Sequence, residues 1–131
     1  MKEYKIKNKD DFIKGWFIKK SICTDLIEYF EKKSNNHVRG LIGGGYRPTW
    51  KKSMDLYLAP NDHDLGPYIH ALSDCMKEYR KIYTVLNDQV GKWNIMENIN
   101  IQKYKSEGGY PAWHCERAGA KKPNRMMVFM T

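Results

Sequence analysis

Apolar residues recur along this chain at two different periods. Over 21–33 they recur every four residues, which predicts an amphipathic helix with Ser21 as its N-cap. Segment 67–86 shows the same period and predicts a second helix. Other segments show apolar residues that alternate with other side chains, or a continuous run of apolar residues, and both patterns predict strands. These segments are 12–18, 53–58, 93–103 and 126–130. The chain is therefore expected to mix helices with strands.

The predicted strand 93–103 precedes the residues that are candidates for a functional site. One of its faces is apolar, and the other is polar and ends at Tyr104. A Gly108-Gly109 turn follows, and then comes a second predicted strand that carries His114 and Glu116. Because side chains two apart in a strand share a face, His114 and Glu116 are predicted to lie side by side. Trp113 and Cys115 are expected to point the other way, into the core.

A histidine and a carboxylate side by side form part of a known kind of metal site. Two histidines and one carboxylate make the facial triad of non-haem Fe(II) oxygenases, in which the remaining positions take oxygen and a co-substrate. His114 and Glu116 are thus candidate metal ligands. A solvated pair is the alternative for a bare His-x-Glu sequence.

The longer run from Tyr104 to Glu116 resembles a particular enzyme family. It reads tyrosine, a glycine-containing turn, a second tyrosine at Tyr110, and then His-x-acid. It resembles the 2-oxoglutarate/Fe(II)-dependent oxygenases of the prolyl 4-hydroxylase-like group, whose first metal ligands form a His-x-Asp pair after such a tyrosine and turn. Glu116 stands where most of that group has aspartate, so the ligand arm is longer by one methylene group.

The resemblance implies a fold for the chain. It implies an α+β domain in which N-terminal helices pack on the first strands of a double-stranded β-helix, a jelly-roll or cupin-like barrel. Residues 1–131 would form one domain, with a helical support region at 1–92 and the first core strands at 93–131. That barrel would be incomplete, and His114 is the last histidine of the sequence. A truncated oxygenase domain is therefore expected.

The resemblance also implies an activity. The family oxidatively decarboxylates 2-oxoglutarate with Fe(II) and O2, commonly with ascorbate as reductant, and hydroxylates a protein or a small molecule. His114 and Glu116 would bind the metal, and Tyr104 and Tyr110 would contribute to the 2-oxoglutarate pocket. A third ligand and a cation for the far carboxylate would lie beyond residue 131. Turnover by the 131-residue chain alone is not expected.

Composition narrows the setting without identifying a function. The 131 residues carry a net charge of +8 and three cysteines without a disulfide or zinc-site spacing, which favours a reducing, cytoplasmic location. No apolar stretch is long enough for a membrane span. The basic residues are scattered in pairs at segment ends, which is typical of solvated loops. For that reason nucleic acid is not expected as a partner of the oxygenase.

Two other interpretations remain open at this point. The chain could be a basic module that binds single-stranded nucleic acid without catalysis, through Tyr46, Arg47, Trp50, Lys51 and Lys52. Alternatively, it could be an inactive remnant that pairs its terminal strand, 126–130, with another chain. Either the remnant or the truncated enzyme could self-associate through that strand.

Overall fold

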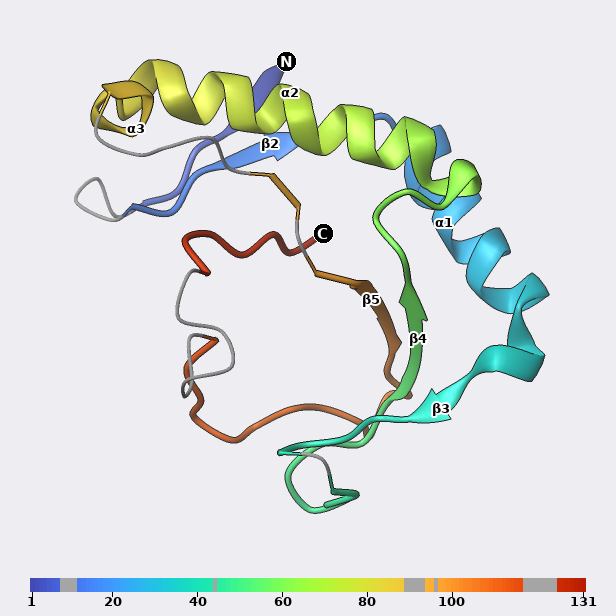
Figure 1. Ribbon diagram of the computed structural model, residues 1–131. Coiled ribbons are helices and arrows are strands. Elements are labelled where there is room, and N and C mark those ends of the chain that lie inside the picture. Colours follow the sequence, from blue (N-terminus) through green and yellow to red (C-terminus); the bar gives the residue numbers. More distant parts are fainter. Residues whose placement is uncertain (8–11, 44, 89–93, 96, 117–124) are drawn as a thin grey trace. The chain divides into compact units, whose positions relative to one another are not determined.

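The computed structural model describes residues 1–7, 12–43, 45–88, 94–95, 97–116 and 125–131 (Figure 1). The fold is α+β, as predicted, with two small antiparallel sheets and helices. No closed barrel occurs in these described ranges. The chain divides into two compact units. Unit 1 comprises Met1–Asn36 and Leu56–Ile101, and unit 2 comprises His37–Asp55 and Gln102–Thr131.

Unit 1 contains most of the helices. Helix α1 (Lys20–Lys32) and helix α2 (Gly66–Ile82) match the two predicted helices closely. The predicted N-cap Ser21 is wrong, because α1 begins at Lys20 and its N-cap, Lys19, makes no side-chain capping bond. Helix α2 is shorter than predicted, since the backbone of Tyr83 leaves helical geometry. A separate turn of helix, α3 (Val85–Asp88), follows.

An apolar core organises unit 1. The most buried side chains, Phe30, Leu56, Leu58 and Leu65, pack together with partly buried residues of α1, α2 and the strand that starts at Ile99. Ile99 and Ile101 lie on the apolar face predicted for the strand 93–103, which confirms that face. The strand is shorter than predicted, because 94–95 and 97–98 are not in a strand, while 93 and 96 lie outside the described residues. The short 3-10 helix η2 (His63–Leu65) places Leu65 in this core.

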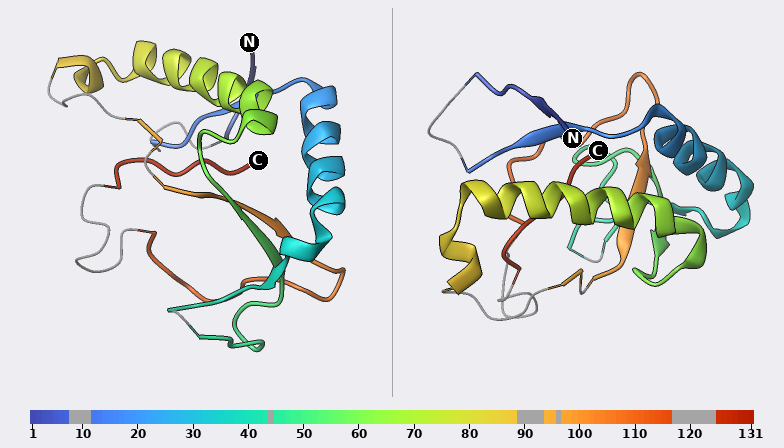
Figure 2. Two further views of the ribbon diagram at one scale, coloured as in Figure 1. Left: turned by 45° about the vertical axis from the view of Figure 1, so that its right-hand side comes forward. Right: turned by 90° about the horizontal axis from the view of Figure 1, so that it is seen from above.

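A small hairpin completes unit 1. Strands β1 (Lys2–Tyr4) and β2 (Gly15–Phe17) are antiparallel, and the β1 strand was not predicted from the sequence. The hairpin lies along α2 (Figure 2), where the hydroxyl of Tyr79 donates a 2.7 Å hydrogen bond to the carbonyl of Phe12. Burial raises the pKa of Tyr79.

The second sheet has the strand order β3-β4-β5. Its strands are β3 (Val38–Arg39), which follows the 3-10 helix η1 (Ser34–Asn36), β4 (Met54–Leu58) and β5 (Ile99–Lys103). Within unit 2, Val38 pairs with Asp55 and Arg39 with Met54. The strand predicted at 53–58 is confirmed. Its faces are not as predicted, because Asp55 is buried and Met54 is exposed.

Two predicted strands of unit 2 are wrong. Neither the His114 segment, as far as Glu116, nor 125–131 forms a regular strand in the described ranges. Pro111, three residues before His114, lacks a backbone N–H and so cannot donate to a strand ladder. Residues 125–130 alternate between half-buried and exposed, as a strand would, yet no ladder pairs them. The expectation that 126–130 pairs with another chain stays a prediction.

Candidate functional site

The candidate site lies in unit 2 on the segment that follows β5. The chain turns at once, and the amide of Gly108 donates a 2.8 Å hydrogen bond to the carbonyl of Lys105. Glycine is required at this point, because a Cβ on Gly108 would lie 2.6 Å from the carbonyl oxygen of Lys52. The amide of Lys52 in turn donates a 3.0 Å hydrogen bond to the carbonyl of Gly109. The turn is thus fastened directly to the segment that precedes β4.

His114 and Glu116 lie side by side, as predicted, although they are not in a regular strand. The Nε2 atom of His114 is 3.2 Å from Oε1 of Glu116. The Nδ1 atom of His114 is 2.8 Å from the carbonyl oxygen of Ala112. Because a carbonyl only accepts, Nδ1 carries a proton, and Nε2 is the nitrogen directed at the carboxylate. Both side chains remain partly open to solvent.

Arg125 fixes the other side of the Glu116 carboxylate. Its guanidinium Nη1 donates hydrogen bonds to Oε2 of Glu116 at 2.8 Å and to the Glu116 carbonyl oxygen at 2.5 Å. The arginine side chain is mostly buried. Arg125 therefore holds the carboxylate through Oε2, while Oε1 stays directed at His114.

Tyr110 supports the imidazole of His114. The two rings are stacked, with centroids 4.2 Å apart and planes 11° from parallel. The ammonium group of Lys51 lies 5.8 Å from the centroid of the Tyr110 ring. Trp113 and Cys115 are both exposed, which contradicts the prediction that they belong to the core.

A buried ion pair, which the sequence did not reveal, lies beside this segment. The Nζ atom of Lys51 is 2.7 Å from Oδ2 of Asp55, and the two residues are only 3% and 0% exposed. The hydroxyl of Ser53 donates a 2.6 Å hydrogen bond to the other oxygen of Asp55. Gly40 closes over the pair, because a Cβ there would overlap the Ser53 hydroxyl and lie 2.9 Å from Cε of Lys51.

Tyr104 belongs to the same polar cluster. Its hydroxyl donates a 2.7 Å hydrogen bond to Oε1 of Gln102. Burial raises the pKa of Tyr104, the nearby Ser53 hydroxyl lowers it, and the charges of Asp55 and Tyr110 raise it further. Unit 2 thus brings the two predicted tyrosines, Tyr104 and Tyr110, towards one group of polar side chains.

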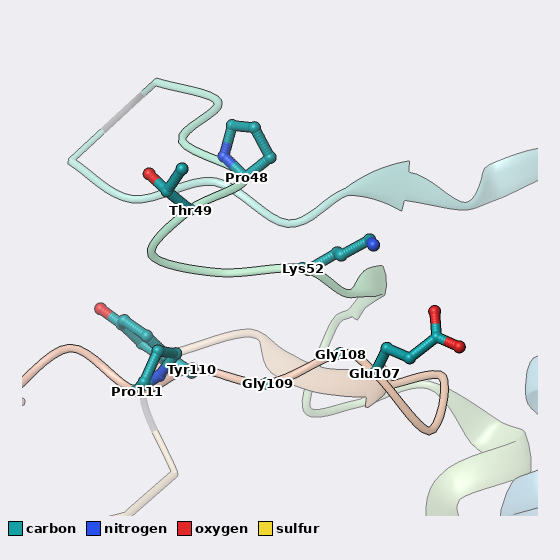
Figure 3. Close-up of a pocket in the computed structure, with 8 residues that line it drawn as sticks. All are labelled: Pro48, Thr49, Lys52, Glu107, Gly108, Gly109, Tyr110 and Pro111. Atoms are coloured by element: carbon teal, nitrogen blue, oxygen red, sulfur yellow. The ribbon is translucent and has the colours of Figure 1, made fainter.

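A shallow pocket of about 450 Å³ adjoins Tyr110. In Figure 3, Tyr110 and Pro111 stand across from Pro48 and Thr49, with the side chains of Lys52 and Glu107 farther along. The pocket therefore has apolar walls together with one cation and one anion.

The remaining candidate ligands do not join His114 and Glu116. Among the described residues, no group of three or more His, Cys, Asp or Glu side chains could hold a metal ion. His37 is half-buried in unit 2, whereas His63 and His70 belong to unit 1. Within the described part of the chain, the structure accordingly brings together two candidate ligands, His114 and Glu116.

The aspartates of the turn after β4 have a structural role. Asp62 accepts a 3.0 Å hydrogen bond from the amide of Asp64 and so caps η2, as expected for a turn. Its other oxygen accepts a 2.9 Å hydrogen bond from the hydroxyl of Tyr29.

No protein-family profile, curated protein or solved structure matches this chain. No helix in the described ranges is long and apolar enough to cross a membrane.

Proposed function

We propose that this chain belongs to a 2-oxoglutarate- and Fe(II)-dependent dioxygenase, in which His114 and Glu116 hold the metal. The observation that carries the proposal is the 3.2 Å separation between Nε2 of His114 and Oε1 of Glu116. Two ligands bound at about 2.1 Å lie about 3.0 Å apart at an octahedral angle and about 3.4 Å apart at a tetrahedral angle. The observed separation lies between these values.

The orientation of the His114 ring supports the same conclusion. Nδ1 faces the Ala112 carbonyl and Nε2 faces Oε1 of Glu116, so one nitrogen and one oxygen point at the same place. A divalent metal ion could be held there by both atoms. The bond from Nδ1 to the Ala112 carbonyl is the outer-shell contact that commonly orients a metal-binding histidine.

The surroundings of the pair suit a hard divalent cation. Glu116 supplies an oxygen and His114 a nitrogen, which are donors that Fe(II) accepts in two-histidine, one-carboxylate sites. Arg125 keeps the second carboxylate oxygen occupied, so Glu116 would bind through one oxygen. The stacked ring of Tyr110 limits rotation of the imidazole. Unit 2 thus holds both ligands before any metal arrives.

Tyr104 and Tyr110 are proposed to take part in binding 2-oxoglutarate. When bound, iron and 2-oxoglutarate would supply the oxidative chemistry that places an oxygen atom in a C–H bond. The protein's residues would orient the acid and exclude water. The Tyr104 hydroxyl, which donates to Oε1 of Gln102 in this structure, would instead donate to a carboxylate of the bound acid. The proposed complete fold is the double-stranded β-helix, to which β3, β4 and β5 would contribute.

The test is whether metal and 2-oxoglutarate bind cooperatively. Mn(II) replaces Fe(II), and its affinity is measured by electron paramagnetic resonance with and without 2-oxoglutarate. We expect 2-oxoglutarate to tighten Mn(II) binding, and Tyr104→Phe to weaken that effect while leaving Mn(II) affinity alone unchanged. Equal Mn(II) affinity with and without 2-oxoglutarate would exclude the co-substrate.

A turnover assay supplies a second test. The assay contains Fe(II), ascorbate and O2 and measures the succinate formed from 2-oxoglutarate. Succinate is expected only from a protein that supplies a third metal ligand besides His114 and Glu116, because two protein ligands hold a metal weakly. Succinate released by the 131-residue chain and lost on His114→Ala would show that this chain itself completes the site. Succinate formation that survives His114→Ala would contradict the proposal.

A further inference from the structure

The end of β3 and the loop that leads from it to β4, together called the 39–53 loop, present two arginine–aromatic pairs. The guanidinium carbon of Arg39 lies 5.3 Å from the centroid of the Tyr46 ring. That of Arg47 lies 5.5 Å from the ring of Trp50. Both distances fall within the range of cation–π contacts. Each pair therefore combines a flat aromatic surface with a guanidinium group already held beside it.

The aromatic rings of this loop are open to solvent. Tyr46 is 48% exposed and Trp50 is 49% exposed, so each ring offers a substantial free surface. The loop is held in shape by turns, including the bonds from the amides of Trp50 and Lys51 to the carbonyl of Arg47.

The charge of the loop has one sign. Between His37 and Met54 the sequence has two arginines and two lysines, and it has no aspartate or glutamate. Lys51 is buried in its ion pair with Asp55 and cannot reach a ligand. Arg39, Arg47 and Lys52 are exposed. Glu107, at the rim of the pocket that Lys52 also lines, is an exposed acidic neighbour.

We propose that this loop binds single-stranded nucleic acid. Tyr46 and Trp50 would stack on bases, while Arg39, Arg47 and Lys52 would contact phosphates. Aromatic platforms alternating with cations are the usual means of binding single strands without sequence preference. The proposal is independent of the metal pair, and it differs from the sequence-based interpretation by adding Arg39 and removing Lys51.

Single strands fit these observations better than an acidic polypeptide does. Every nucleobase has a flat face that stacks on a ring, and a guanidinium group forms paired hydrogen bonds with a phosphate. An acidic polypeptide would use the cations but would leave the exposed faces of Tyr46 and Trp50 without a partner. The two ligands can be separated by experiment.

The experiment measures fluorescence anisotropy of a labelled oligothymidylate with the whole chain. Trp50→Ala should weaken binding about tenfold, whereas Trp50→Phe, which keeps a stacking ring, should restore most of the affinity. Arg39→Gln and Arg47→Gln should each weaken binding severalfold. Three phosphate contacts predict a slope of about −2 for log K against log salt, and each arginine removed should reduce it by about 0.7.

Matched controls distinguish a site from bulk charge. Lys77 and Lys81 of α2 are exposed lysines of unit 1, and their replacement by Gln should leave affinity nearly unchanged. Glu107→Gln should tighten binding. Equal losses for Lys77→Gln and Arg47→Gln, no loss for Trp50→Ala, absence of binding at low salt, or equal competition by polyglutamate would each overturn the proposal.

Discussion

The two units bury opposite kinds of side chain. Every buried apolar residue among those described lies in unit 1: Phe30, Leu56, Leu58, Leu65, Tyr68 and Leu72. The buried charged residues, Lys51 and Asp55, both lie in unit 2. The change occurs within β4, between Asp55 and Leu56.

This difference indicates that apolar burial stabilises unit 1, whereas unit 2 contains the polar contacts around the candidate site. Apolar burial is non-directional and tolerates small shifts, so unit 1 can act as a support. A buried ion pair depends on accurately placed partners. Each charge loses its hydration on burial, and only well-placed partner charges and hydrogen bonds offset that loss. Unit 2 is therefore held by a few directional contacts, and the same kind of contact positions His114 and Glu116.

The largest effect should come from breaking the buried ion pair. Asp55→Ala leaves the Lys51 ammonium buried without its carboxylate, which should cost about 3–5 kcal/mol in the free energy of unfolding. The measurement is urea denaturation. The double variant Lys51→Met/Asp55→Leu removes both charges and should recover most of that loss. A loss below about 1 kcal/mol for Asp55→Ala would contradict the account of unit 2.

Next comes a deletion in the apolar core of unit 1. Leu65 is fully buried, so Leu65→Ala should lower the free energy of unfolding by about 3 kcal/mol through lost burial and a new cavity. Ile27→Ala is the control, because Ile27 is an exposed residue of α1 and should lose much less. Calorimetric melting compares them. Equal losses for the two variants would remove the evidence for an organised core in unit 1.

A glycine comparison tests the turn that carries the site. Gly108→Ala places a Cβ against backbone atoms of Lys52 and Lys105, which cannot move without displacing the turn. A loss of about 1–3 kcal/mol is expected. Gly109→Ala meets nothing closer than 4.0 Å and should be nearly neutral. Equal stability of the two alanine variants would show that the Gly108 turn is not fixed by that contact.

The smallest effect concerns alkaline pH in unit 1. Burial, and then the hydrogen bond to Asp62, raise the pKa of Tyr29 from 10.0 to about 12. The fold therefore favours the neutral phenol, and this contribution is complete below pH 10 and is lost as pH rises through about 12. The stability difference between the native chain and Tyr29→Phe should shrink over that interval. A difference that stays constant from pH 9 to pH 12 would contradict the assignment.

The sequence predicted unit 1 better than unit 2, for a physical reason. Periodic apolar positions such as Leu26, Phe30 and Leu72 report directly which helix face is buried, because burial follows hydrophobicity. Errors in the helices of unit 1 were confined to their ends, as at Ser21 and Tyr83, whereas the short strand β1 was missed and β2 is shorter than the predicted strand 12–18. The α+β class could be read from these periods alone.

In unit 2 the decisive contacts depend on particular partners. The alternation in 53–58 predicted that Asp55 faces water, but Asp55 is buried in its ion pair with Lys51. A strand pattern gives no indication that a lysine four residues earlier will be its partner. The spacing Lys-x-Ser-x-Asp is the signal that could have suggested the pair. The His114–Glu116 proximity was predicted correctly, because side chains two apart share a side in any extended segment. Arg125 could not be predicted, because it lies nine residues from Glu116 in the sequence and no periodic pattern relates the two.

The central claim is that His114 and Glu116 form a metal site, and Mn(II) binding tests it most directly. Calorimetric titration of the native chain should show one weak site, and His114→Ala and Glu116→Ala should each abolish it. His70→Ala, a histidine of α2, should bind Mn(II) as the native chain does. Equal Mn(II) uptake by the native chain and by the His114→Ala/Glu116→Ala double variant would contradict the claim.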